Sequence, residues 1–194
     1  MARLSATDMA KPTTGGSRRF KARIAGFLFL ILVLTAATTE FFARGKLGST
    51  AILVAAIFEV SCMIAVTVLF YDLFKTVDRR VSLLAASLNF VALVLELLQF
   101  LPRRVNIGLA FHGFYWILIG YLMLRSAFLP RLFGVLIVIA GLCWLTFVPP
   151  PLASYLSPYN LASALVLQGL AMLWLLVMGV NIPTRARARR GELT

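Results

Sequence analysis

Charged residues and cysteines are scarce in this chain, and both shortages exclude whole classes of protein. Only 13% of the 194 residues are charged, and 61% are apolar. An average soluble domain has roughly 25% charged and 45–50% apolar residues. A soluble fold of this size needs a more polar surface, and a disordered chain has far fewer apolar residues, so both are excluded. Two cysteines are too few for a disulfide scaffold.

Long apolar runs dominate the sequence instead and predict an all-α membrane bundle. A helix needs roughly 20 apolar residues to cross the hydrocarbon core of a bilayer. Transmembrane strands would alternate in character, whereas the run at 25–34 is apolar throughout. We predict six transmembrane helices, at 24–42, 51–72, 81–101, 106–125, 131–148 and 160–180.

One transmembrane domain at 23–181 is therefore expected between two basic tails. The tails are 1–22, expected to be disordered, and 182–194. The proline-rich connection at 149–159 is expected to be stiff and to lie at the membrane interface, because proline blocks helix continuation.

The distribution of basic residues predicts the orientation. With six spans, the tails and the two loops on their side hold 15 Lys and Arg residues, and the opposite side holds four. The positive-inside rule then places both termini in the cytoplasm. The tails are expected to contact anionic lipid headgroups. Nucleic acid is not an expected partner, because no nucleic-acid-binding module accompanies the arginine-rich stretch at 185–190.

Polar side chains within the spans are the candidate functional residues, because ionisable groups are costly in hydrocarbon. The glutamates, the histidine and the amides fall mainly in the half of each span away from the basic loops, which predicts a polar pocket in the outer half of the bundle. The candidate ligand-binding residues are Glu59, Glu96, Gln99, His112, Tyr115, Trp116 and Gln168.

Two interpretations of these residues stay open. They can line a pocket, or they can hydrogen-bond between helices as structural packing, at about 1 kcal/mol or less per contact. Tyr115 and Trp116 can belong to the pocket wall or to an interfacial aromatic belt.

No enzymatic or metal site is predicted, and the cofactor is left unassigned. The four lysines all lie outside the predicted spans, which excludes a retinal Schiff base, and a single histidine excludes bis-histidine haem. No phosphate-binding loop or HExxH motif is present. We therefore assign no catalytic residue and no metal ligand, and expect a protein without enzymatic activity.

Three stretches of the chain carry a family resemblance. They are Arg23–Gly26, the longer stretch Phe111–Leu136 with its His112-Gly113 pair, and Trp174–Val180. In these the chain resembles the bacterial domain-of-unknown-function family 4386, small multi-pass membrane proteins, over residues 20–181. The resemblance implies a helical bundle in the bacterial inner membrane and carries no established activity.

Three functions follow as hypotheses. The first is a membrane protein whose outer pocket binds a small amphipathic or apolar ligand. The second is an accessory subunit of a larger membrane complex, or a homo-oligomer. The third is a proton-linked transporter of small molecules that uses Glu59 and Glu96.

Overall fold

A computed structural model of the chain describes residues 14–38, 48–98, 107–126, 129–156 and 159–179. The described residues form seven helices and no strand, which confirms the all-α prediction for this part of the chain. The helices are α1 (Thr14–Ala37), α2 (Ser49–Phe74), α3 (Arg79–Leu98), α4 (Ile107–Arg125), α5 (Arg131–Leu145), α6 (Pro150–Leu156) and α7 (Tyr159–Met178).

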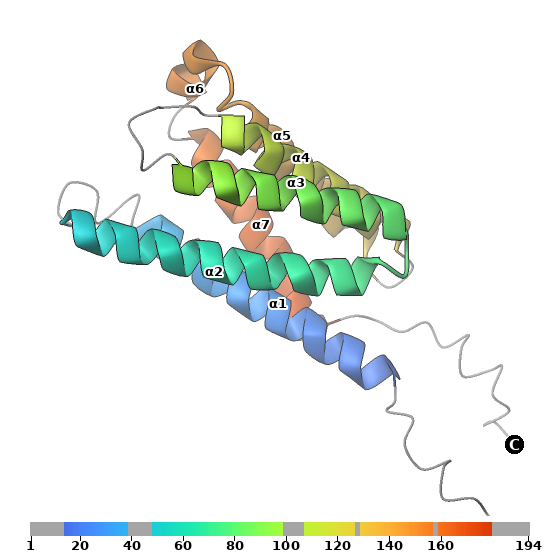
Figure 1. Cartoon of the computed structure of the whole chain (residues 1–194). Coiled ribbons are helices and arrows are strands. Elements are labelled where there is room, and N and C mark those ends of the chain that lie inside the picture. Colours follow the sequence, from blue (N-terminus) through green and yellow to red (C-terminus); the bar gives the residue numbers. More distant parts are fainter. Residues whose placement is uncertain (1–13, 39–47, 99–106, 127–128, 157–158, 180–194) are drawn as a thin grey trace, which may run out of the picture.

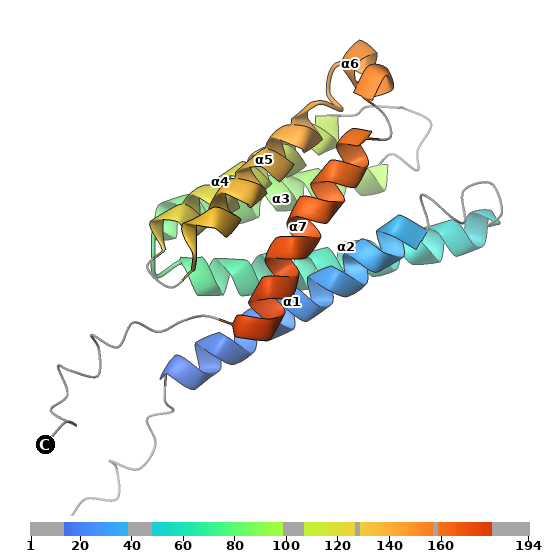
Figure 2. The same cartoon turned by 180° about the vertical axis from the view of Figure 1, so that it is seen from behind.

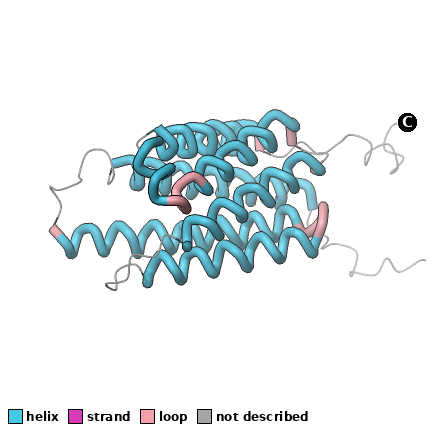
Figure 3. The backbone as a smooth tube through the Cα atoms, turned by 90° about the horizontal axis from the view of Figure 1, so that it is seen from above, coloured by secondary structure: helices cyan, strands magenta, loops and turns pink. Residues whose placement is uncertain are grey.

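The six longer helices pack in a closed ring. Each contacts its neighbour in the order α1, α2, α3, α4, α5, α7, and α7 returns to contact α1. Successive helices run antiparallel, so the start of α1 and the end of α7 lie at the same end of the bundle (Figures 1 and 2). Figure 3 shows these helices running roughly along one common axis.

The helices fit a multi-pass membrane protein. Five of them are long and apolar enough to cross a bilayer, namely α1 from Arg19 onward, α2, α3, α4 and α7. Large apolar side chains also cover the outside of the bundle, where Leu34, Val94 and Val166 are more than half exposed. A soluble protein rarely exposes so much contiguous apolar surface, whereas lipid tails solvate it without cost.

The predicted fifth span differs from the structure at its outer end. Helix α5 stops at Leu145 after 15 residues, and the chain then turns by 118° into the short helix α6. The proline-rich connection, which we expected to be a stiff segment that blocks helix continuation, thus contains a helical turn. Pro150 and Pro151 are tolerated there, because the backbone N–H groups of the first turn of a helix have no hydrogen-bond partner within the helix.

The first span also begins earlier than predicted. Helix α1 starts at Thr14, inside the segment expected to be a disordered tail. Two contacts hold its early turns against other helices: Lys21 forms a salt bridge with Asp72 of α2, and the Arg23 guanidinium donates to the Val177 carbonyl of α7 at 3.3 Å. Residues 39–42, 99–101, 106 and 180 of the predicted spans lie outside the described residues.

Basic side chains gather at the end of the bundle where α1 begins. Every lysine and arginine whose side chain is described lies there, on α1, α3, α5 or close to the end of α2 or α4. They are Arg19, Lys21, Arg23, Lys75, Arg79, Arg80, Arg125 and Arg131. Asp72 pairs with two of the lysines, and Asp78 lies 3.7 Å from Arg125. The bundle therefore has one strongly basic end.

Two pairs of glycines bring α4 and α5 unusually close. Gly113 faces Gly141 and Gly120 faces Gly134, so that a Cβ at Gly120 would lie 2.8 Å from the carbonyl oxygen of Gly134. Backbones of transmembrane helices approach in this way where small residues line the interface. The close approach sets the position of every side chain that α5 directs toward α4.

Substituting Gly120→Ala should destabilise the bundle by about 1–3 kcal/mol, because the new methyl group has no space. It would meet backbone atoms of α5 and Val138 Cγ2, 2.6 Å away. The unfolding midpoint in detergent measures the loss. Gly169→Ala is the matched control, because nothing lies within 4 Å of a Cβ there. Equal stability of the two variants would contradict the close-packing account.

Candidate functional site

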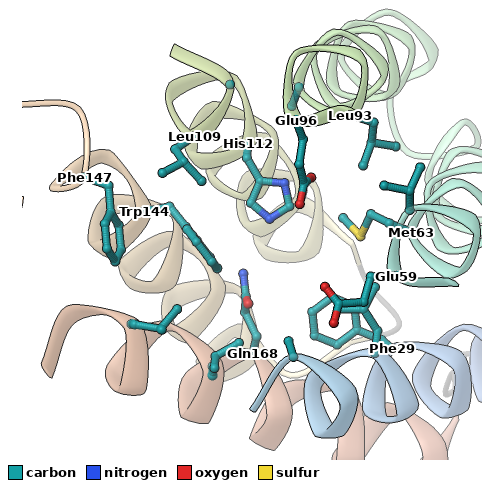
Figure 4. A pocket seen from close by; sticks show the side chains of 17 residues that line it. Phe29, Glu59, Met63, Leu93, Glu96, Leu109, His112, Trp144, Phe147 and Gln168 are labelled. Carbon is teal, nitrogen blue, oxygen red and sulfur yellow. The ribbon is translucent and has the colours of Figure 1, made fainter. Parts of the chain in front are cut away.

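A cavity of about 410 Å³ lies at the end of the bundle opposite the basic end (Figure 4). This size falls within the range of roughly 300–1,000 Å³ that is typical of small-molecule sites. All six long helices contribute to its wall. The lining residues are Phe29, Leu32, Ala36, Glu59, Val60, Met63, Ala92, Leu93, Glu96, Gly108, Leu109, His112, Trp144, Phe147, Leu161, Leu165 and Gln168.

Four of the seven candidate residues meet at this cavity. Glu59 of α2, Glu96 of α3, His112 of α4 and Gln168 of α7 all line it, and Figure 4 shows their side chains directed into the same space. Helices far apart in the sequence are thus brought together by the closed ring. Whether these residues bind a ligand stays a prediction.

The other three candidates are placed differently. Tyr115 and Trp116 are fully buried in the helix core and are not among the lining residues, so they lie neither on the pocket wall nor in an exposed aromatic belt. Gln99 lies outside the described residues.

A chain of hydrogen bonds runs from Trp116 to helix α2. The Trp116 indole N–H donates to His112 Nε2 at 2.9 Å, which leaves the ring proton on Nδ1. His112 Nδ1 then donates to Asn89 Oδ1 at 3.2 Å, and the Asn89 amide donates to Thr67 Oγ1 at 2.6 Å. The Thr67 hydroxyl donates in turn to the Met63 carbonyl at 2.7 Å. Every donor in the chain meets an acceptor.

Gln168 extends this network to α5 and α7. Its amide has one satisfactory orientation, in which the oxygen accepts from the Trp144 indole N–H and shares the Trp116 indole N–H with His112 Nε2, each donor lying 3.0 Å from the oxygen. Gln168 is only 1% exposed, and a buried amide without partners would be costly. The network thus connects α2, α3, α4, α5 and α7 at one level of the bundle.

Both ring nitrogens of His112 are used by this network. One ring nitrogen accepts a hydrogen bond and the other donates one, so the ring is neutral and has no lone pair left for a metal ion. The Trp144 ring packs edge-on against it with centroids 5.1 Å apart. Within the described ranges, no three His, Cys, Asp or Glu side chains are grouped so as to hold a metal ion.

The cavity has an apolar floor. Phe29 lies edge-on to Trp116 with ring centroids 5.0 Å apart, and Phe70 contacts the same indole at 6.3 Å. Large apolar side chains fill the interior from there to the basic end, and those less than 2% exposed include Phe74, Leu122 and Leu175. The cavity therefore ends near the middle of the bundle.

Glu96 and Glu59 line the cavity from the neighbouring helices α3 and α2. Glu96 is also exposed at the surface of α3, two residues before the last described residue of that helix. Glu59 is half-buried on the facing helix α2. Phe147, in the turn between α5 and α6, also lines the cavity, so the short helix α5 ends at its level.

Sequence reasoning missed several residues that shape this site. Thr67 completes the hydrogen-bond chain by accepting from Asn89, and Trp144 forms part of the wall. The four-residue spacing of His112 and Trp116 is a usable signal for one bond, since such residues share a helix face. The position of Trp144 depends on the glycine contact between α4 and α5, which one sequence does not reveal.

No model of a known protein family, no curated protein and no solved structure matches the chain. The resemblance to family 4386 accordingly stays a prediction, and the functional argument rests on the residues of this chain alone.

Substituting Asn89→Ala should destabilise the bundle by about 1–2 kcal/mol, because it leaves the His112 N–H and the Thr67 hydroxyl oxygen without their partner. Thermal unfolding in detergent gives the loss. Ser87→Ala is the control on the same helix, since its hydroxyl is exposed and bonds only to the Leu83 carbonyl. Thr67→Val added to Asn89→Ala should cost less than its effect alone, as expected for coupled residues. Strictly additive losses would argue against one continuous network.

Proposed function

We propose that this protein is a six-span integral membrane protein of the bacterial inner membrane with both termini in the cytoplasm. The antiparallel ring supports this topology, because α5 takes its own place in the ring. It packs between α4 and α7, just as each of the five longer helices packs between two neighbours. Its 15 residues reach about 22 Å. The basic end of the bundle supports the orientation, since basic residues concentrate on the cytoplasmic side of inner-membrane proteins. Membership of family 4386 is part of the same proposal.

The function we propose is binding of a small amphipathic or apolar molecule in the cavity, without enzymatic activity. The observation that carries the proposal is a cavity of about 410 Å³ with a largely apolar wall and four converging polar side chains. Ligand sites in proteins typically combine these two features. In the proposed orientation the cavity lies in the outer half of the membrane, where an amphipathic molecule can enter from the outer leaflet.

Structural packing explains only part of this arrangement. The hydrogen-bond network accounts for His112 and Gln168 as connections between helices. Glu59 and Glu96 face the same space from α2 and α3. Polar packing would also be expected to close the space between the helices, since protein interiors are close-packed. A ligand site accounts for the space that remains between the helices.

Proton-linked transport is the alternative that the two glutamates favour. It would need a second conformation, because large buried side chains such as Phe70 and Leu122 fill the interior below the cavity and close the path toward the basic end. The accessory-subunit hypothesis remains a further proposal, with the exposed apolar faces of the helices as its contact surface.

Filling the cavity should remove bound molecules. Leu165→Trp places a large side chain in the wall, whereas Val166→Trp points the same side chain outward from an exposed position on α7. We expect native mass spectrometry of protein extracted in lipid nanodiscs to show a retained small molecule with wild type and with Val166→Trp, and none with Leu165→Trp. Identical spectra for all three proteins would count against the pocket.

The orientation predicts the location of the C-terminus. A reporter that works only in the periplasm, fused after Thr194, should give no signal, and a cytoplasmic reporter at the same position should be active. Activity of the periplasmic fusion would overturn the proposed topology.

A further inference from the structure

We propose that four arginines at the basic end of the bundle bind the phosphate group of an anionic phospholipid, whose acyl chains lie along exposed apolar side chains of the same helices. The four are Arg79, Arg80, Arg125 and Arg131. We call the surface that they form the arginine surface. It lies at the end of the bundle away from the cavity, so the inference goes beyond the proposed function and does not depend on it.

Three neighbouring helix ends bring the arginines together. Helices α3 and α5 begin at this end and α4, which packs between them, ends there. Arg125 Nη1 lies 3.7 Å from the carboxylate of Asp78, the residue directly before Arg79. On the other side of α4, a Cβ at Gly134 would lie 2.9 Å from the backbone nitrogen of Leu124, so the first turn of α5 lies against the last turn of α4. All four arginines are exposed.

The carboxylate beside these arginines already has other partners. Asp78 Oδ1 accepts from two backbone N–H groups in the first turn of α3, at 3.0 and 3.2 Å, and Oδ2 faces Arg125. The other acidic side chain that the structure describes at this end, Asp72, pairs with two lysines. One carboxylate balances at most one of four guanidinium charges. A phosphate group fits the remainder, because guanidinium groups bind it through paired N–H donors.

An exposed apolar or aromatic side chain lies one helical turn deeper than each arginine. Residues four apart share a face of a helix, and α4 runs opposite to α3 and α5. The pairs are Arg79 with Leu83, Arg80 with Leu84, Arg125 with Tyr121, and Arg131 with Val135; the four deeper residues are between 40% and 54% exposed. The guanidinium carbon of Arg125 lies 5.5 Å from the centre of the Tyr121 ring.

This arrangement favours a lipid over other phosphate compounds. A phospholipid presents an anion and apolar chains at the same spacing, head above tail, as the arginines and the deeper side chains. Inorganic phosphate and nucleic acid present the anion without the chains. In the proposed orientation the arginine surface also lies at the cytoplasmic leaflet, whose surface potential is negative.

The test measures lipid binding by native mass spectrometry of the full chain in a mild detergent. The probes are phosphatidylglycerol and phosphatidylcholine with the same acyl chains, and the dissociation constant of the first bound lipid is determined. We expect phosphatidylglycerol to bind about tenfold or more tightly, since each basic residue near an anionic headgroup strengthens binding roughly fivefold. Glycerophosphoglycerol, the same headgroup without acyl chains, should not displace it at equal concentration.

Arginine variants locate the recognition. Arg79→Gln combined with Arg131→Gln should bring the affinity for phosphatidylglycerol within about threefold of that for phosphatidylcholine. Arg187→Gln combined with Arg189→Gln is the matched control, because it removes the same charge from the basic C-terminal tail and should keep the preference. Thermal unfolding of each variant verifies the fold. If the first pair does not fold, Arg80→Gln alone should weaken phosphatidylglycerol binding about fivefold.

Three results would overturn the proposal. Equal affinity for the two lipids would show that the arginines do not select an anionic headgroup. Loss of the preference in the tail variant, with the preference kept in the helix-end variant, would assign recognition to the tail. Displacement of phosphatidylglycerol by the free headgroup or by a single-stranded oligonucleotide would show a site for phosphate without acyl chains. None of these results changes the argument for the cavity.

Discussion

The need to satisfy polar groups inside an apolar bundle governs this structure. Trp116 donates to His112, and His112, Asn89 and Thr67 each accept one hydrogen bond and donate the next, so that the chain ends on a backbone carbonyl of α2. No water is available in a hydrocarbon environment to replace a missing partner. The five helices that carry the network are therefore fixed relative to one another at the level of His112, and the cavity lies directly beside this fixed level.

Close helix packing and the polar network depend on each other. The glycine pairs let α5 approach α4, and this approach places the Trp144 ring against His112 and its N–H group within reach of Gln168. On one side of the network the interior is filled by aromatic and aliphatic side chains. On the other side the helices enclose space. The same residues thus act as a structural connection and as the boundary of the candidate site.

The sequence predicts the helices better than their termini. Apolar runs indicate where the helices lie, and five of the described helices are long and apolar enough to cross a membrane, because hydropathy reflects a strong physical constraint. Runs of apolar residues do not show that α5 stops at Leu145 or that two prolines begin a helix at Pro150, because those boundaries depend on local backbone bonding.

The candidate site, too, is predicted by the sequence only in part. The depth of Glu59, Glu96, His112 and Gln168 in their spans is readable from the sequence and places them at one end of the bundle. Which of them face each other depends on the order of the helices around the ring. Tyr115 and Trp116 follow His112 by three and four residues and share its side of the helix, yet they lie one turn further along the axis, where the interior of the bundle is filled.

Helices α2 and α5 occupy opposite positions in the ring and differ greatly in length. Helix α2 has 26 residues and reaches about 39 Å, whereas α5 reaches about 22 Å, against a hydrocarbon core of roughly 30 Å. In a bilayer, lipids beside α5 must shorten or bend toward the protein, while those beside α2 stretch or the helix tilts. Such a bundle imposes a gradient of thickness on the surrounding membrane. It is accommodated at least cost where the bilayer is itself uneven, for example at the border between lipid domains.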